Sequence, residues 1–161
     1  MKKKELTIPV EVYTDSRDLE TADQLLLDLA RKTTADAYAP YSGFRVAAAV
    51  RLANGKILTG TNQENASFPA GICAERVALS AASALYPGVA ITDLAVSFFR
   101  GAGNNSKPIS PCGICRQTLT EYERRSGEPI RLILGGHSGE VFILKRAADL
   151  LPLAFTSEEM K

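Results

Sequence analysis

The chain has 161 residues, of which 45% are hydrophobic and 23% charged, and a formal net charge of +1. This length suits one domain with a substantial core, and the balanced charge excludes strong electrostatic binding to nucleic acid or to a membrane surface. No apolar run reaches the about 18 residues of a transmembrane helix, and no signal-peptide run follows the basic start MKKK, so we expect a cytoplasmic protein.

The first part of the chain is predicted to form an arm, a helix and a hairpin. Residues 1–15 show no clear period and are interpreted as an N-terminal arm, and residues 16–161 as one domain. From Ser16 to Ala30, apolar residues recur at helical spacing, and Asp15 or Ser16 can cap that helix. Two apolar runs, 44–52 and 56–62, flank Asn54-Gly55, whose residues both favour the positive φ angles of a tight hairpin turn.

The second part alternates predicted helices and strands. Residues 73–85 are alanine-rich and helical in pattern, 91–99 form a strand, and 115–125 form a helix that ends near Gly127. Two strands follow at 130–134 and 141–145, and then a short helical turn within 147–155. This order predicts a three-layer α/β/α fold with a mixed five-stranded sheet flanked by helices and right-handed crossovers.

Three cysteines in two clusters indicate a metal site. Cys112 and Cys115 have the spacing that directs two sulfurs to one ion, and Cys73 opens a predicted helix. Both clusters are expected at helix N-termini, where the helix dipole and backbone N–H groups favour the thiolate that zinc binds. The fourth position of a tetrahedral site could hold water, as in catalytic sites, or His137, the only histidine, as in a structural site.

Glu75 lies two residues after Cys73 and favours the catalytic interpretation. A carboxylate beside a zinc site can take a proton from water and pass it on. Alone, a glutamate in the first turn of a helix is explained by its interaction with the helix dipole. Next to a cysteine, and combined with PCGIC at 111–115, the proton-transfer role is the better explanation.

The segments CAE (73–75) and PCGIC (111–115) match the signature of zinc-dependent nucleoside and nucleobase deaminases. Further segments extend the match: YAPYSGF (38–44), GTNQENASFPAGICAER (60–76), PCGICRQ (111–117) and LLPLAF (150–155). From Tyr38 to Phe155 the chain therefore resembles the small cytidine deaminases. The resemblance implies hydrolysis of cytidine, and of deoxycytidine, to the uracil nucleoside and ammonia in pyrimidine salvage.

The resemblance also implies roles for single residues. In that family three cysteines hold one Zn²⁺ per chain, one glutamate carries protons, and an arginine hydrogen-bonds the ligand sulfurs; the matching residues are Cys73, Cys112, Cys115, Glu75 and Arg76. The substrate-binding positions are Phe44 beside the pyrimidine, Asn62 and Glu64 at the ribose 3′-hydroxyl, Ala74 next to the base, and Ala66, Phe68 and Phe155 at a neighbouring subunit's pocket. The implied assembly is a homotetramer with shared active sites.

Two alternatives stay open at this point. A related deaminase that acts on a nucleoside antibiotic, a free base or a base in a polynucleotide shares many of these motifs, although editing enzymes need a basic surface and usually carry histidine where Cys73 stands. A non-catalytic, zinc-stabilised interaction module would close the metal site with His137 or Glu75. A small nucleoside remains the expected partner, with no nucleic acid and no membrane.

Overall fold

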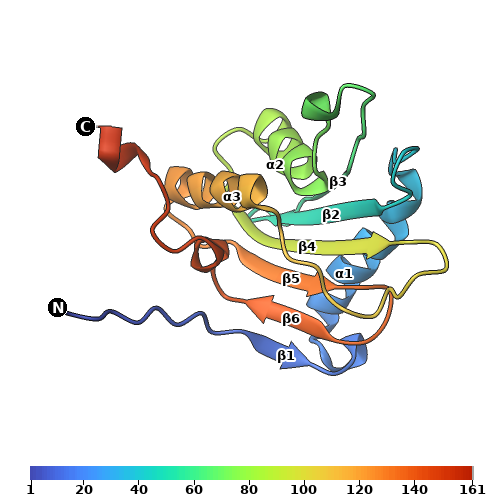
Figure 1. Ribbon diagram of the computed structural model, residues 1–161, viewed down its shortest axis with the longest axis horizontal. Coiled ribbons are helices and arrows are strands. Elements are labelled where there is room, and N and C mark those ends of the chain that lie inside the picture. The colour runs from blue at the N-terminus through green and yellow to red at the C-terminus, as the bar shows by residue number, and fades with distance from the viewer. Residues whose placement is uncertain (161) are drawn as a thin grey trace.

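The computed structural model describes residues 1–160 as a mixed sheet of six strands with helices on both faces (Figure 1). The strand order is β1-β6-β5-β4-β2-β3. The strands are β1 (Glu11–Tyr13), β2 (Arg45–Leu52), β3 (Ile57–Thr61), β4 (Ile91–Phe99), β5 (Arg131–Gly135) and β6 (Val141–Leu144); the α-helices are α1 (Thr21–Thr33), α2 (Ala74–Leu85) and α3 (Gly113–Ser126). The expected three-layer α/β fold is confirmed.

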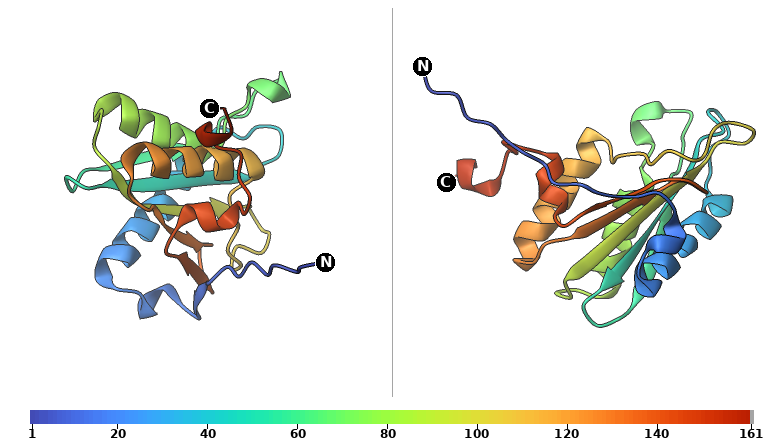
Figure 2. Two further views of the ribbon diagram at one scale, coloured as in Figure 1. Left: turned by 90° about the vertical axis from the view of Figure 1, so that its left-hand side faces the viewer. Right: turned by 90° about the horizontal axis from the view of Figure 1, so that it is seen from below.

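Helix α1 covers one face of the sheet, and α2 and α3 cover the other (Figure 2). Successive residues of a strand point to opposite faces. On β2, Val46, Ala48 and Val50 therefore pack into the core under α2 and α3, whereas Ala49 packs into the core under α1. No helix within residues 1–160 is long and apolar enough to cross a lipid bilayer.

The sheet topology brings the beginnings of α2 and α3 together. Strands β3 and β4 both run antiparallel to β2, so they point in the same direction. The loops that follow them leave the sheet at the same end, and these loops lead into α2 and α3. The first residues of both helices, which carry the cysteines, therefore meet above one end of the sheet.

The sheet has one strand more than the sequence predicts. Strand β1 lies within the segment expected to be an arm and pairs antiparallel with β6, with Glu11 opposite Ile143 and Tyr13 opposite Val141. Three residues are too few to produce a recognisable strand period, which explains why the expectation of five strands is wrong. Lys161, the last residue of the expected domain, lies outside the described residues.

Two local expectations are also corrected. Asp15 caps a short 3-10 helix (Ser16–Asp18), where its Oδ1 accepts a hydrogen bond from the Arg17 N–H at 2.8 Å, and α1 begins only at Thr21. In the hairpin loop only Gly55 has a positive φ, of 78°. The Gly55 N–H donates to the Leu52 carbonyl at 2.8 Å. The loop is thus a three-residue turn ending in a left-handed glycine, a common alternative to the two-residue turn.

Candidate metal centre and adjoining cavity

The three cysteines come together where α2 and α3 begin. Cys73 is the N-cap residue of α2, Cys112 is the N-cap residue of α3, and Cys115 lies in the first turn of α3. Their sulfur atoms all lie within 4.8 Å of one another, and those of Cys73 and Cys112 are 3.8 Å apart. Tetrahedral Zn–S bonds of about 2.3 Å place two sulfurs about 3.8 Å apart. The donor set and its spacing therefore fit a zinc ion.

The protonation of the thiols also favours a cation. The neighbouring Cys115 thiol lowers the pKa of Cys73 to about 6, and the same interaction, together with burial, raises the pKa of Cys115. The pair therefore accepts one negative charge readily and resists a second. A divalent cation removes this resistance because it binds thiolates and displaces their protons.

Glu75 lies beside the thiol cluster and is almost fully buried, with 5% of its surface exposed. Burial is the largest cause that raises the pKa of Glu75 above its ordinary value of 4.5. The charge of Glu75 raises the pKa of Cys73 and Cys115, while the positive charge of Arg76 lowers the pKa of Cys73 and of Glu75. Both the position of the Glu75 carboxyl group and its raised pKa are those expected of a group that exchanges protons near the metal site.

His137 lies away from the cysteines, on the α1 side of the sheet. Its Nε2 is 3.2 Å from the Thr34 hydroxyl, and its ring lies against Phe99, with 5.2 Å between the ring centroids. Within residues 1–160 the metal-ligating cluster consists of the three cysteines. A structural site closed by His137 therefore finds no support in the fold.

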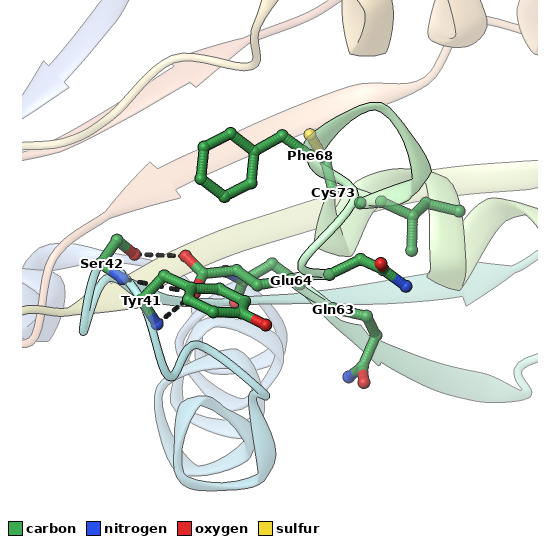
Figure 3. A pocket seen from close by; sticks show the side chains of 10 residues that line it. Tyr41, Ser42, Gln63, Glu64, Phe68 and Cys73 are labelled. Atoms are coloured by element: carbon green, nitrogen blue, oxygen red, sulfur yellow. Dashed lines mark hydrogen bonds between the residues drawn. The ribbon is translucent and has the colours of Figure 1, made fainter.

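A cavity of about 450 Å³ adjoins the cluster at Cys73 (Figure 3). Its walls come from the turn after residue 40, from the end of β3 and from the loop that leads into α2. The lining residues are Tyr41, Ser42, Asn62, Gln63, Glu64, Asn65, Phe68, Gly71, Ile72 and Cys73. A cavity of this volume can hold a small organic ligand.

Asn62 and Glu64 both line this cavity, but so do Gln63 and Asn65 between and after them, so the position of the pair does not follow from strand alternation alone. The Asn62 Oδ1 accepts from the Val46 N–H at 2.8 Å, and the Asn62 Nδ2 donates to the Phe44 carbonyl at 2.9 Å. An amide group has two N–H donors, so one remains for a ligand. Glu64 accepts from the backbone N–H groups of Tyr41 and Ser42 and from the Ser42 hydroxyl.

Of the other predicted substrate residues, Phe68 lines the cavity, and Phe44, Ala66, Ala74 and Phe155 lie outside its lining. Phe44 is half-buried and stacks on Phe98, with 5.4 Å between the ring centroids, and Ala74 is fully buried in the core. Phe68 is 76% exposed, Phe155 is 61% exposed on the C-terminal tail, and Ala66 is exposed in the loop between β3 and Phe68. Exposure of these side chains is compatible with contacts to another subunit, and their roles stay predictions.

Tyr41 and Ser42 are cavity residues that the sequence reasoning did not single out. They belong to the YSG segment, whose Gly43 has a positive φ of 66°. The Tyr41 ring meets the Phe68 ring edge to face, with 6.1 Å between the centroids. The signal that could have found them is the turn itself, because glycine-containing turns often present backbone N–H groups to an anion.

Comparison with known proteins agrees with this geometry. Residues 20–126 match the family model for the cytidine and deoxycytidylate deaminase zinc-binding region. A cytidine deaminase from Halalkalibacterium halodurans is 35% identical over 139 residues, which are 85% of this chain and 96% of that protein. The crystal structure of a cytidine deaminase from Burkholderia pseudomallei superposes with a TM-score of 0.70 at 37% identity, covering 85% of this chain and all of that one. For the Mycobacterium tuberculosis cytidine deaminase the TM-score is 0.65 at 31% identity, covering 85% of this chain and 99% of that one.

Proposed function

The chain belongs to the cytidine and deoxycytidylate deaminase family, and we propose that it hydrolyses cytidine and deoxycytidine to the uracil nucleosides and ammonia, as a step of pyrimidine salvage. The observation that carries this proposal is the meeting of three thiols and one buried carboxyl group at the end of a nucleoside-sized cavity. The same cavity is lined by the carboxylate of Glu64 and the amide of Asn62.

The cysteine cluster is the zinc site of this enzyme. Cys73, Cys112 and Cys115 hold one Zn²⁺ per chain, and Arg76 offsets part of the negative charge of the thiolates. A Zn²⁺ ion bound by three protein ligands supplies a water whose pKa is lowered toward about 7.

Glu75 moves the protons of the reaction. It takes a proton from water and gives it to N3, which makes C4 electrophilic enough for the water oxygen to attack. It then takes the proton of the new C4 hydroxyl and gives it to the amino nitrogen, so that the C4=O bond forms, the C4–N bond breaks and ammonia leaves. Burial raises the pKa of Glu75, which brings this carboxyl group closer to the pH at which it must both accept and release a proton.

The sugar and the base are held by the other cavity residues. Glu64 accepts, and Asn62 donates, a hydrogen bond at the ribose 3′-hydroxyl, which satisfies both halves of that group. Phe44 lies beside the pyrimidine ring, and the small Ala74 lets the base approach the start of α2. A free base leaves Glu64 and Asn62 without this partner, so it is a poor substrate.

The enzyme is a cytoplasmic homotetramer with shared active sites. Ala66, Phe68 and Phe155 reach the cavity of a neighbouring subunit, which is supported by the exposure of both phenylalanine side chains, at 76% and 61%. The three cysteines are free thiols in this chain, which suits a reducing compartment.

The decisive experiment follows the ultraviolet absorbance of cytidine during incubation with purified protein whose zinc content has been measured. The wild-type protein should convert cytidine to uridine, and Glu75→Gln should keep one zinc per chain but lose turnover by about 100-fold or more, since proton transfer of this kind contributes about 10²–10⁴-fold. Glutamine preserves the shape of the side chain and cannot carry the proton.

The same pair of proteins separates the alternatives. Loss of zinc and of thermal stability in Glu75→Gln would make Glu75 a structural ligand and would overturn the catalytic role. A zinc-loaded wild-type protein that leaves cytidine and deoxycytidine unchanged would instead redirect the substrate assignment to a modified nucleoside.

A further inference from the structure

Ser42 joins the two halves of the proposed nucleoside site. Its hydroxyl donates a hydrogen bond to the Glu64 Oε1 and accepts one from the Phe44 N–H at 3.0 Å. Glu64 belongs to the sugar half of the site and Phe44 to the base half. Figure 3 shows the contact between Ser42 and Glu64. One exposed serine therefore links the side chain proposed to hold the sugar to the backbone of the residue proposed to flank the base.

The turn that carries Ser42 is built to hold a carboxylate. The Gly43 N–H donates to the Ala39 carbonyl at 3.0 Å, and the positive φ of Gly43 closes the turn. The backbone N–H groups of Tyr41 and Ser42 consequently both point to the Glu64 Oε2, at 2.9 and 3.3 Å. Consecutive N–H groups of this kind form an anion-binding concavity.

Glu64 is brought to this turn by the backbone on both sides of it. The Tyr38 N–H donates to the Asn62 carbonyl at 3.2 Å, and the Glu64 N–H donates to the Tyr38 carbonyl at 2.8 Å. Residues 38 and 63 are thereby bridged in parallel. The hydrogen bonds from Ser42 and Tyr41 lower the pKa of Glu64, and the Ser42 hydroxyl is the largest cause, so the side chain is an anion at neutral pH.

The number of acceptor positions limits what Glu64 can bind. A carboxylate offers about four lone-pair positions. Two on Oε2 are filled by the backbone N–H groups, and one on Oε1 is filled by the Ser42 hydroxyl. The remaining position is on Oε1, beside the Ser42 hydroxyl, and it can accept one further hydroxyl group.

We propose that Ser42 is a positioning residue for substrate specificity: it orients Glu64 so that one Oε1 position accepts a single sugar hydroxyl, and it couples that position to Phe44 at the base. This inference rests on the proposed function. It assigns to Ser42 an effect on binding of the nucleoside sugar and none on the chemical step, because the hydroxyl contacts neither the thiol cluster nor Glu75.

The test compares Ser42→Ala, Ser42→Thr and wild-type protein with cytidine and with 3′-deoxycytidine. For cytidine, Ser42→Ala should raise KM by about fivefold to tenfold, the usual effect of one lost hydrogen bond, and leave kcat within about twofold. The wild-type preference for cytidine over 3′-deoxycytidine in kcat/KM should shrink by about threefold or more in Ser42→Ala. The reason is that the Ser42 hydroxyl and the sugar 3′-hydroxyl bind the same carboxylate oxygen, so their contributions are not independent. Ser42→Thr keeps the hydroxyl and should restore both values.

A matched control is Ser106→Ala, because the Ser106 hydroxyl also donates a hydrogen bond within an exposed loop, to the Asn104 Oδ1 at 2.6 Å, but does not line the cavity. It should leave both kinetic values unchanged. Zinc content and melting temperature are measured for every variant.

The outcomes separate this inference from the proposed function. Absence of cytidine turnover in the zinc-loaded wild-type protein contradicts the proposed function. Normal wild-type turnover together with an unchanged KM and an unchanged preference in Ser42→Ala overturns the role of Ser42. A Ser42→Ala variant that loses zinc, stability or kcat, or a Ser42→Thr variant that restores nothing, also overturns it, since the role would then be structural.

Discussion

Arg76 is the residue for which we predict a role in the charge balance of the metal cluster. Three thiolates and one Zn²⁺ carry one net negative charge, which opposes ionisation of a water at the site. The N-termini of α2 and α3 offset part of this charge, and the positive charge of Arg76 acts against burial, which raises the pKa of Glu75 and opposes ionisation of Cys73. We predict that Arg76→Ala keeps the fold and loses about 10-fold to 100-fold in zinc retention or turnover, as is usual for groups that support metal ligands.

The measurement for Arg76 is zinc content against increasing chelator, together with the rate on cytidine. Arg17→Ala is the control, because the Arg17 side chain is 82% exposed and, within residues 1–160, its hydrogen bonds and ion pair are all with Asp15. Zinc retention and rate that match those of the Arg17 variant would show that Arg76 contributes nothing to the site.

His137 gives the protein a pH-dependent contribution to stability. Burial, and then the charge of Arg31, lower the pKa of His137 below its ordinary value of 6.5. The unfolded chain therefore binds a proton at higher pH than the folded chain does. The contribution is fully present above pH 6.5 and is lost as the pH falls from 6.5 through the lower folded pKa.

The free energy of unfolding of the wild-type protein should fall as the pH is lowered from about 7.5 to about 5.5. We expect it to fall by less in His137→Gln, because glutamine does not take up a proton in this range. Urea denaturation of both proteins at the two pH values measures this difference, and any loss of zinc at low pH affects both equally. An identical pH dependence in the two proteins would contradict the assignment.

The contact between β3 and α2 depends on Gly60. A Cβ atom at this position would lie 2.4 Å from the Ala78 nitrogen and 2.7 Å from the Ala74 carbonyl oxygen, both in the α2 backbone. Gly60→Ala must therefore push α2 away from the sheet and displace Cys73 and Glu75 at its start. We predict a loss of stability of about 1–3 kcal/mol, typical of overpacking, together with weaker zinc binding.

Gly113→Ala is the matched substitution for Gly60→Ala. Gly113 begins α3 between two zinc ligands, and a Cβ atom there meets nothing within 4 Å. Alanine has the higher helix propensity, so this variant should be neutral or up to about 1 kcal/mol more stable. Thermal unfolding and zinc analysis of both variants provide the comparison; equal effects would mean that the β3–α2 approach does not control the site.

Elements with a strong apolar pattern could be predicted from the sequence, and features that depend on single backbone contacts could not. The sequence predicts strand β4 at residues 91–99, and the strand spans Ile91–Phe99, because most of its residues are buried and glycines lie on both sides of it. The apolar pattern places the start of α1 at Ser16, but a separate 3-10 helix occupies Ser16–Asp18. Strand β1 escaped prediction because its evidence is its pairing with β6, which lies far along the chain.

In the site, too, features encoded by a local sequence pattern could be predicted, and those that depend on single backbone contacts could not. The thiol cluster could be predicted because the ligand spacing and the helix starts are local in sequence, and the sheet then brings Cys73 to Cys112. The contact between Ser42 and Glu64 could not, because it depends on backbone bonds between residue 38 and residues 62–64 that leave no side-chain pattern. The sequence of residues 62–65 shows that Glu64 is a carboxylate, but it does not show how many of the acceptor positions of that carboxylate are already filled by other groups of the protein.

If active sites are shared between subunits, two inactive variants should complement each other in a mixed tetramer. If Phe155 completes the cavity of a neighbouring subunit, Phe155→Ala and Glu75→Gln damage the same site from different chains. Each variant alone should be nearly inactive. In mixed tetramers, some sites combine Glu75 from one chain with Phe155 from another, so co-expression or joint refolding of the two variants should restore up to about a quarter of the wild-type activity per chain, by random association in a closed symmetric assembly. A mixture that is no more active than the two variants measured separately would contradict the shared cavity. Phe155, although 61% exposed, would then belong to its own subunit's site or to no active site.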